Sequence, residues 1–217
     1  MDVLSASSDD HKIAWYENNG SGGFGAQTLI SQAGETKTAQ SVYAADLDGD
    51  GDMDVLSASS TDDKIAWYQN NGSGTFTTQS SISTSANSAR SVYAADLDGD
   101  GDMDVLSASA NDDKIAWYKN DGSGSFTAQT AISTSVNGAY SVYAADLDGD
   151  GHLDLTVSSQ VLGVAVAYGV GNGTFATPVY LGTSAMSHAV VDVNGDGRLD
   201  IVSVDISADT FRVFLAD

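Results

Sequence analysis

Three observations predict an all-β fold, a β-propeller of four-stranded antiparallel blades with about 4–5 blades in this chain. The segment SVYAADLDGDGDMDVLSAS occurs at 41–59 and again, unchanged, at 91–109, and its first eleven residues return at 141–151. The period of 50 residues is typical of propellers and other repeat proteins. Short β-branched and aromatic runs alternate with Gly-rich turns, and we find no stretch of helical periodicity.

Each unit reads as four strands in a fixed order. SVYAADL comes first and ends at an acidic loop, and DVLSAS follows that loop. KIAWY, which begins at 12, 64 and 114, is the third run, and FTTQSSIS (76–83) represents the fourth. The alanines of the first run suit an inner strand, where blades crowd near an axis. The Asn-Gly and Gly-rich turns between the runs are typical of hairpins.

The KIAWY run predicts a sheet that is covered on both sides. Ile65 and Trp67 should point to one face, and Ala66 and Tyr68 to the other, because side chains alternate along a strand. Both faces are then apolar, which stacked blades would bury. We therefore expect the recurring tryptophans, Trp15, Trp67 and Trp117, to fill the space between blades rather than to form stacking platforms for sugars.

The repeat divides a single repeat domain, 1–217, into units of about 1–40, 41–90, 91–140, 141–186 and 187–217, of which the first and last are partial blades. Counting the runs gives three, twelve and three strands, about 18 in total. The fourth unit lacks the DDK and WY elements, so its outer strands should pack differently. The chain opens at MDVL, which matches only the end of an acidic loop. We expect a partial or open propeller, as a fragment of a longer ring or a half closed by a second copy.

Composition excludes several partners. The chain has 8 Lys+Arg against 30 Asp+Glu, a formal charge of −22, which argues against nucleic acid and anionic membranes. It has no cysteine, so it has neither disulfides nor a thiolate metal site. The longest apolar run is too short for membrane insertion. DVLSAS directly after Met1 is unlike a signal peptide, so we expect any export signal to lie outside this chain.

The acidic residues are concentrated. Seventeen of the 30 fall in four nine-residue windows, 46–54, 96–104, 146–154 and 192–200. Places 1, 5 and 9 of each window are Asp, place 3 is Asp or Asn, and places 4 and 6 are Gly. Alternate side chains can converge on one point while the glycines allow sharp turns. Oxygen ligands in a flexible loop favour calcium, and a dication would resolve the repulsion among the carboxylates.

Two further places have simple interpretations. Place 7 is Asp, His or Arg, which is consistent with use of its main-chain carbonyl alone, and place 8 is Met or Leu, which we expect to tuck under the blade. An EF-hand would need Glu at place 12 and flanking helices, whereas place 12 is Ser or Val here and the flanks read as strands.

The D-x-D-G-D-G-x-x-D loop between two strands, followed by W-Y-x-N-x-G-x-G-x-F, resembles the FG-GAP/VCBS repeats of integrin-like β-propellers. The resemblance covers nearly the whole chain and implies calcium in the hairpin between the first and second strands of each blade. The metal ligands it implies, with place 7 acting through its carbonyl, are Asp46, Asp48, Asp50, Asp52 and Asp54; Asp96, Asp98, Asp100, Asp102 and Asp104; Asp146, Asp148, Asp150, His152 and Asp154; and Asp192, Asn194, Asp196, Arg198 and Asp200.

We therefore expect about four Ca²⁺ sites in an extracellular or cell-surface module for adhesion, ligand binding or scaffolding, and no enzyme. The alternative is a carbohydrate-binding propeller, as a lectin or an accessory module of a polysaccharide-degrading enzyme. A polysaccharide lyase would need a cleft that gathers Arg90, Arg198 or Arg212 with His188 and a tyrosine. The pairs Asp62–Asp63 and Asp112–Asp113 are interpreted as turn residues, with a secondary cation site as the alternative.

Overall fold

The computed structural model describes residues 1–31, 34–78, 81–182, 184–205 and 208–216. In these residues eighteen strands form five antiparallel sheets, and within each sheet the strands follow one another in chain order. The first sheet contains β1 (Val3–Ser7), β2 (Lys12–Tyr16) and β3 (Thr28–Leu29). The second contains β4 (Ala39–Ala45), β5 (Asp54–Ser59), β6 (Lys64–Asn70) and β7 (Phe76–Thr78). The third contains β8 (Ala89–Ala95), β9 (Asp104–Ser109), β10 (Lys114–Asn120) and β11 (Phe126–Ala128). The fourth contains β12 (Ala139–Ala145), β13 (Asp154–Ser159), β14 (Gly163–Ala167) and β15 (Val179–Leu181), and the fifth β16 (Ser187–Val191), β17 (Asp200–Asp205) and β18 (Thr210–Phe214).

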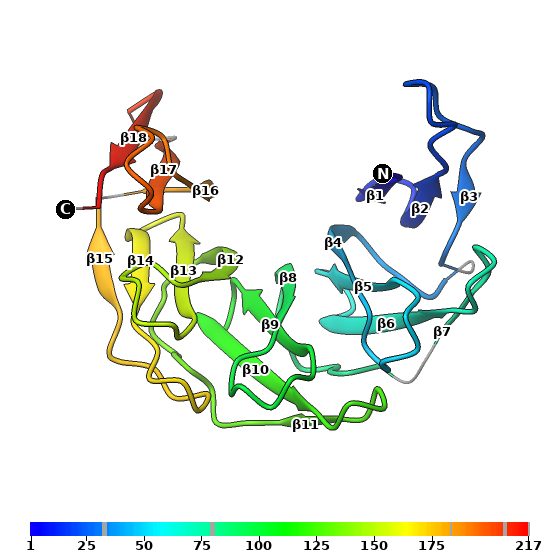
Figure 1. The fold of residues 1–217 in the computed structure, drawn as a ribbon, viewed down its shortest axis with the longest axis horizontal. Helices are drawn as coiled ribbons and strands as arrows, with labels where there is room; N and C mark the ends of the chain where they lie inside the picture. The colour runs from blue at the N-terminus through cyan, green and yellow to red at the C-terminus, as the bar shows by residue number, and fades with distance from the viewer. Residues whose placement is uncertain (32–33, 79–80, 183, 206–207, 217) are drawn as a thin grey trace.

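The sheets are arranged as blades around an arc, and the first and fifth stand apart at its two ends (Figure 1). The first strands β4, β8 and β12 are neighbours on the inner side of this arc, and β16 lies next to β12. Ala94 and Ala144 of these strands are buried, whereas the equivalent Ala44 of β4 is exposed. The all-β propeller prediction is thus confirmed, including the inner position of the SVYAA strands. In the described residues no helix has the length and hydrophobicity of a membrane span.

The two faces of each blade pack against different neighbours, as the alternation in KIAWY predicts. Ile65 and Trp67 join a core with the third sheet, whereas Ala66 and Tyr68 join a core with the first sheet. The same division recurs one blade further on, where Trp117 packs toward the fourth sheet. The hydrophobic core is therefore a series of inter-blade layers, each built by one sheet from either side.

The fourth sheet keeps the strand order of the second and third but moves its outer strand. β7 and β11 pair with the end of the third strand, from Tyr68 and Tyr118 onward. β15 instead pairs with Val164–Val166, the beginning of β14. The outer chain nevertheless follows a similar path, because isolated bridges join Ile65 to Ser83 in the second sheet and Gly169 to Phe175 in the fourth, so the expected difference is confined to the extent of regular pairing.

The fifth sheet leaves its outward face uncovered in the described residues. Val204, Phe211 and Val213 are exposed by 50%, 72% and 40%. Strand pairing places Phe211 and Val213 at the positions that Ile65 and Trp67 occupy in the second sheet, where the next blade buries them. The last sheet therefore carries a face of the kind that packs against another blade.

Candidate metal centres

Each acidic window forms the hairpin loop between the first two strands of a blade, and in the second sheet it joins β4 to β5. The loop folds around its own first carboxylate, because Asp46 accepts hydrogen bonds from the N–H groups of Gly49, at 2.8 Å, and Gly51, at 3.0 Å. Both glycines have positive φ, +74° and +92°, which a residue with a Cβ adopts only with strain. Asp50 accepts a further bond from the N–H of Asp52 at 2.9 Å. The glycines are thus needed for a turn that directs backbone donors at the carboxylates.

The ninth residue connects the loop to the rest of the blade. Asp54 is fully buried and accepts hydrogen bonds from the N–H groups of Leu47, at 3.2 Å, and Asn70, at 2.7 Å. Burial raises the pKa of Asp54, and it raises the pKa of its equivalent Asp104 to about 6. A dication beside these groups would favour their ionised form and offset the cost of burial.

The same bonds recur in the other three windows. Asp96, Asp146 and Asp192 at place 1 and Asp100, Asp150 and Asp196 at place 5 accept bonds from backbone N–H groups of their own loops, and so do Asp104, Asp154 and Asp200 at place 9. Place 9 also accepts a bond from the end of the third strand or beyond, from Asn120, Gly169 and Ala216. Four copies of one geometry follow from four copies of one sequence pattern.

The third residue of the loop is different. Asp48 Oδ1 and Asp98 Oδ1 are buried and have no hydrogen-bond partner in the structure. A buried carboxylate oxygen without a partner is costly unless a cation satisfies it. The loops therefore contain an oxygen that their own backbone does not satisfy.

Carboxylate oxygens gather in three of the loops. Ligand atoms lie within 4.8 Å of one another in three triads, Asp46, Asp48 and Asp50; Asp96, Asp98 and Asp104; and Asp146, Asp148 and Asp154. All are hard oxygen donors, and the unsatisfied oxygens of Asp48 and Asp98 belong to two of the triads. The donor set and the unsatisfied oxygens fit Ca²⁺ better than a soft metal.

The fourth window is weaker by the same criteria. Asn194 stands at place 3, where its Nδ2 donates to Asp196 Oδ2 at 2.9 Å and its Oδ1 accepts from the N–H of Asp196 at 2.9 Å. Hydrogen bonds from the Arg198 N–H and from the Asn194 side chain lower the pKa of Asp196, and the positive charge of Arg198 lowers it further. This loop keeps the backbone geometry with fewer free carboxylate oxygens.

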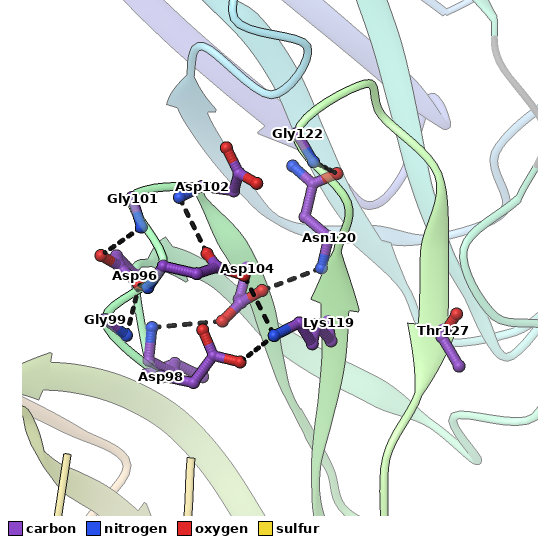
Figure 2. Close-up of polar contacts among 12 residues, drawn as sticks. Asp96, Asp98, Gly99, Gly101, Asp102, Asp104, Lys119, Asn120, Gly122 and Thr127 are labelled. Carbon is purple, nitrogen blue, oxygen red and sulfur yellow. Dashed lines mark hydrogen bonds and ion pairs between the residues drawn. The ribbon is translucent and has the colours of Figure 1, made fainter. Parts of the chain in front are cut away.

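The two identical loops differ in the residue opposite their third place. Gln69 Nε2 donates to Asp48 Oδ2 in the second sheet. In the third sheet, Lys119 forms an ion pair with Asp98 Oδ2 (Figure 2) and a second, at 3.0 Å, with Asp100 Oδ2. Sequence reasoning did not find these partners, because they lie on the third strand and reach the loop only once the sheet has formed.

Place 8 corrects one expectation, and place 7 shows a contact of its own. The side chains of Asp52, Asp102 and His152 at place 7 lie against Gly72, Gly122 and Gly171 of the Gly-rich turns, where a Cβ would clash. Met53 and Met103 at place 8 do not tuck under the blade and are 60% and 40% exposed. They line a cavity of about 670 Å³ together with Tyr43 of β4 and Tyr93 of β8.

The tryptophans fill the space between blades. Trp67 and Trp117 are buried, at 5% and 7% exposure, and Trp67 meets Phe126 of the next sheet edge-on with ring centroids 5.9 Å apart. The rings of Trp67 and Trp117 occupy the space that a Cβ would need at Gly124 and Gly173. The interpretation as inter-blade packing is confirmed for these two, while Trp15 is half-buried and packs on Phe76 in the same way.

The acidic pairs outside the loops are turn residues. Asp62 accepts a hydrogen bond from Ser59 Oγ at 2.5 Å and pairs with Lys64 at 3.5 Å. Asp63 has a φ of +55° and accepts a bond from the N–H of Ser88 at 2.8 Å. Asp112 and Asp113 repeat these roles.

The residues considered for a lyase have separate partners. Arg90 contacts Gln40 and the ring of Tyr140, and Arg212 pairs with the buried Asp205 at 2.9 Å. His188 bonds Thr156 Oγ1 at 2.7 Å, and burial lowers its pKa to about 4. These contacts bind neighbouring strands and blades together.

Comparisons with known proteins agree with this architecture. Among solved structures, a Burkholderia pseudomallei lectin, BP39L, is similar with a TM-score of 0.76 and 17% identity over all of this chain and 63% of its own. An Agrocybe aegerita lectin whose structure concerns recognition of non-reducing terminal N-acetylglucosamine has a TM-score of 0.63 and 23% identity, covering 94% of this chain and 60% of its own. The V. cholerae biofilm matrix protein Bap1 has a TM-score of 0.50 and 23% identity over 87% of this chain and 28% of its own. This chain thus spans about three fifths of the length of each lectin, and at these identities the likeness shows the fold alone.

The chain matches no curated protein. The FG-GAP-like repeat matches it three times in tandem, at residues 1–57, 46–107 and 96–157, so that well over half of the chain is covered. Each match includes an acidic loop or its end and the strands on either side. The chain therefore belongs to the FG-GAP-like repeat family.

Proposed function

We propose that the chain is a calcium-binding propeller module that serves adhesion, ligand binding or scaffolding outside the cell, and that Ca²⁺ stabilises its blade hairpins. The observation that carries the proposal is the buried oxygen of Asp48 and of Asp98, unsatisfied within loops whose other carboxylates accept backbone hydrogen bonds. The residues that would hold the ions are the side chains at places 1, 3, 5 and 9 and the carbonyl at place 7. Such a module has no catalytic step, because carboxylates held ionised by a metal are unsuited to acid–base work.

Electrostatics gives calcium a large effect on stability. Four ions would change the formal charge from −22 to about −14, which reduces repulsion within each loop. A ligand at a hundredfold excess over its Kd stabilises a folded protein by about 2.7 kcal/mol per site. Several such sites rival the net stability of an ordinary domain, about 5–15 kcal/mol.

Calorimetric titration and thermal melting test the proposal. We expect chelation of calcium to lower the melting temperature by more than about ten degrees. Asp48→Ala should remove one binding site, whereas Asp9→Asn, at an exposed position outside the loops, should leave the number of sites unchanged. An unchanged melt in chelator, or equal stoichiometry in both variants, would contradict the proposal.

An extracellular location is part of the proposal. Calcium is abundant outside cells, and the chain has no cysteine that would need a reducing compartment. The lectins and the biofilm matrix protein with a similar fold support the same location.

The partner of the uncovered face on the fifth sheet is proposed to be another blade, from the remainder of a longer chain or from a second copy. Val204, Phe211 and Val213 are the residues it would bury. Mass and shape in solution with calcium present distinguish an open arc from a ring of two chains.

Carbohydrate binding is the second candidate, favoured by the fold shared with two lectins. Because Trp67 is buried, the place for a sugar is instead the axial cavity, where Tyr43 and Tyr93 lie with ring centroids 4.5 Å apart. Glycan-array binding that is lost in Tyr43→Ala but kept in Tyr180→Ala, with calcium stoichiometry unchanged, would support it. Tyr180 is a suitable control because it is 38% exposed and lies outside the cavity.

A further inference from the structure

The loops 46–54 and 96–104 provide a natural comparison within one molecule. Their nine residues are identical, and so are the five residues on either side of them, 41–45 with 91–95 and 55–59 with 105–109. They share most of their backbone hydrogen bonds, as at Gly49 and Gly99, each 2.8 Å from the first carboxylate of its loop, and Asp96 accepts one more, from the N–H of Asp100 at 3.1 Å. A difference in metal affinity between the two loops must therefore come from their surroundings.

The surroundings differ in charge at one position of the third strand. Lys119 lies opposite Thr127 in the third sheet, as Gln69 lies opposite Thr77 in the second, so Lys119 and Gln69 hold equivalent positions. Gln69 brings a neutral amide to Asp48, whereas Lys119 brings an ammonium to Asp98 (Figure 2) and also to Asp100. By strand register the equivalent residues of the third and fourth windows are Tyr168 and Leu215, and neither is charged.

We infer that Lys119 is a tethered cation that competes with the divalent ion at the loop 96–104 and makes this loop the weaker of the two identical sites. The inference rests on the proposed function, since it presumes that both loops bind calcium.

The geometry gives the competition a direct cause. The Lys119 ammonium contacts two of the carboxylates that would hold the ion, so an ion in this loop either displaces the ammonium or is repelled by it. A lysine ammonium has an ordinary pKa of about 10.4, so Lys119 carries its charge at neutral pH. Its side chain is 39% exposed, which allows it to swing into solvent. Competition should therefore weaken binding without abolishing it.

A consequence is that the two hairpins respond to calcium at different concentrations. When calcium is scarce, Lys119 partly neutralises the loop 96–104, whereas no lysine or arginine of the described residues forms an ion pair with the loop 46–54. Calcium fills the loop 46–54 first and the loop 96–104 only at higher concentration.

Isothermal titration with calcium alone tests this in the full chain. Lys119→Gln reproduces the environment of the first loop and should tighten one class of sites by about tenfold or more, which corresponds to about 1.4 kcal/mol. Gln69→Lys should weaken one class by a similar factor, and Lys119→Arg should bind as the wild type does. Lys114→Gln is the matched control, because it removes the same charge from a lysine that pairs with Asp112 outside the loops, and it should change affinity by less than about twofold.

The outcomes separate this inference from the proposed function. Equal affinities in Lys119→Gln and Lys114→Gln, with calcium still bound, would overturn the role of Lys119 and leave the proposed function in place. Absence of calcium binding in the wild-type chain would overturn both. Melting curves of each variant in chelator check that the substitutions leave the fold intact.

Discussion

Replacing Gly124 by alanine tests the contact that joins one blade to the next. Gly124 has a φ of +76°, and the Trp67 ring of the preceding blade occupies the space that a Cβ would need. Gly22 holds the same place in the first sheet, with a φ of +86°, but in the described residues no atom lies within 4 Å of the position that a Cβ would take there. Gly22→Ala therefore adds backbone strain alone, whereas Gly124→Ala adds strain and a clash.

The magnitudes follow from these two causes. An alanine in the left-handed region costs about 1–2 kcal/mol. Overpacking of a buried site costs about 1–3 kcal/mol more. We expect Gly22→Ala to lower the free energy of unfolding by about 1–2 kcal/mol and Gly124→Ala to lower it by about 2–5 kcal/mol. Denaturant unfolding at fixed calcium concentration measures both.

A double-mutant cycle identifies the origin of the difference. In a Trp67→Ala background the clash is absent, so Gly124→Ala should then cost no more than Gly22→Ala costs in the wild type. The comparison of Gly124→Ala with and without the Trp67 ring does not depend on Gly22→Ala, so fraying of the first sheet does not affect it. Equal costs of Gly124→Ala with and without the Trp67 ring would refute the packing argument.

Two further predictions concern other contacts between blades. Asn120 is buried, and its Nδ2 donates to the carbonyl of Leu47 in the preceding blade at 2.8 Å. Asn120→Ala should therefore lower the free energy of unfolding in denaturant by about 1–3 kcal/mol. Asn70→Ala should cost less, because the Asn70 amide donates to the carbonyl of Met53 at an exposed edge. His188 has its pKa lowered to about 4 by burial, so the unfolded chain takes up a proton near pH 6.5 that the folded chain refuses until about pH 4. The stability that neutral His188 contributes is fully present above about pH 6.5 and is lost as the pH falls toward 4, and the free energy of unfolding then changes by at most about 1.4 kcal/mol per pH unit. His188→Val, which restores the residue found at 42, 92 and 142, should flatten the pH dependence of unfolding in this interval, and an unchanged slope would contradict the assignment.

The sequence was sufficient for features that depend on spacing along one strand or loop. Alternation in KIAWY predicted that both faces of a blade are covered by neighbouring blades, and the Asp and Gly spacing predicted the hairpin that holds the acidic residues. Contacts that need a formed sheet could not be predicted in this way. Lys119 lies 15 or more residues beyond its loop in the chain, and it meets Asp98 only through the register of β9 and β10.

The exposed position of Met53 and Met103 could not be predicted from the local sequence either. An apolar residue in a loop is expected to find a core, and nothing local distinguishes a core from the lining of an axial cavity. The direction of these side chains depends on how steeply neighbouring blades converge, which is a property of the whole arc.

The identity of 41–59 with 91–109 means that the chain offers two equivalent partners for each inner strand. Residues 41–45 could in principle pair with 105–109 as well as with 55–59. Closing the short path 46–53 rather than the path 46–103 favours the native pairing by only about 2 kcal/mol of loop entropy. The acidic hairpin adds a stricter requirement, because its glycine and aspartate contacts form only within one continuous nine-residue segment. The acidic loop thus favours pairing of 41–45 with 55–59 over pairing with the identical segment 105–109 during folding.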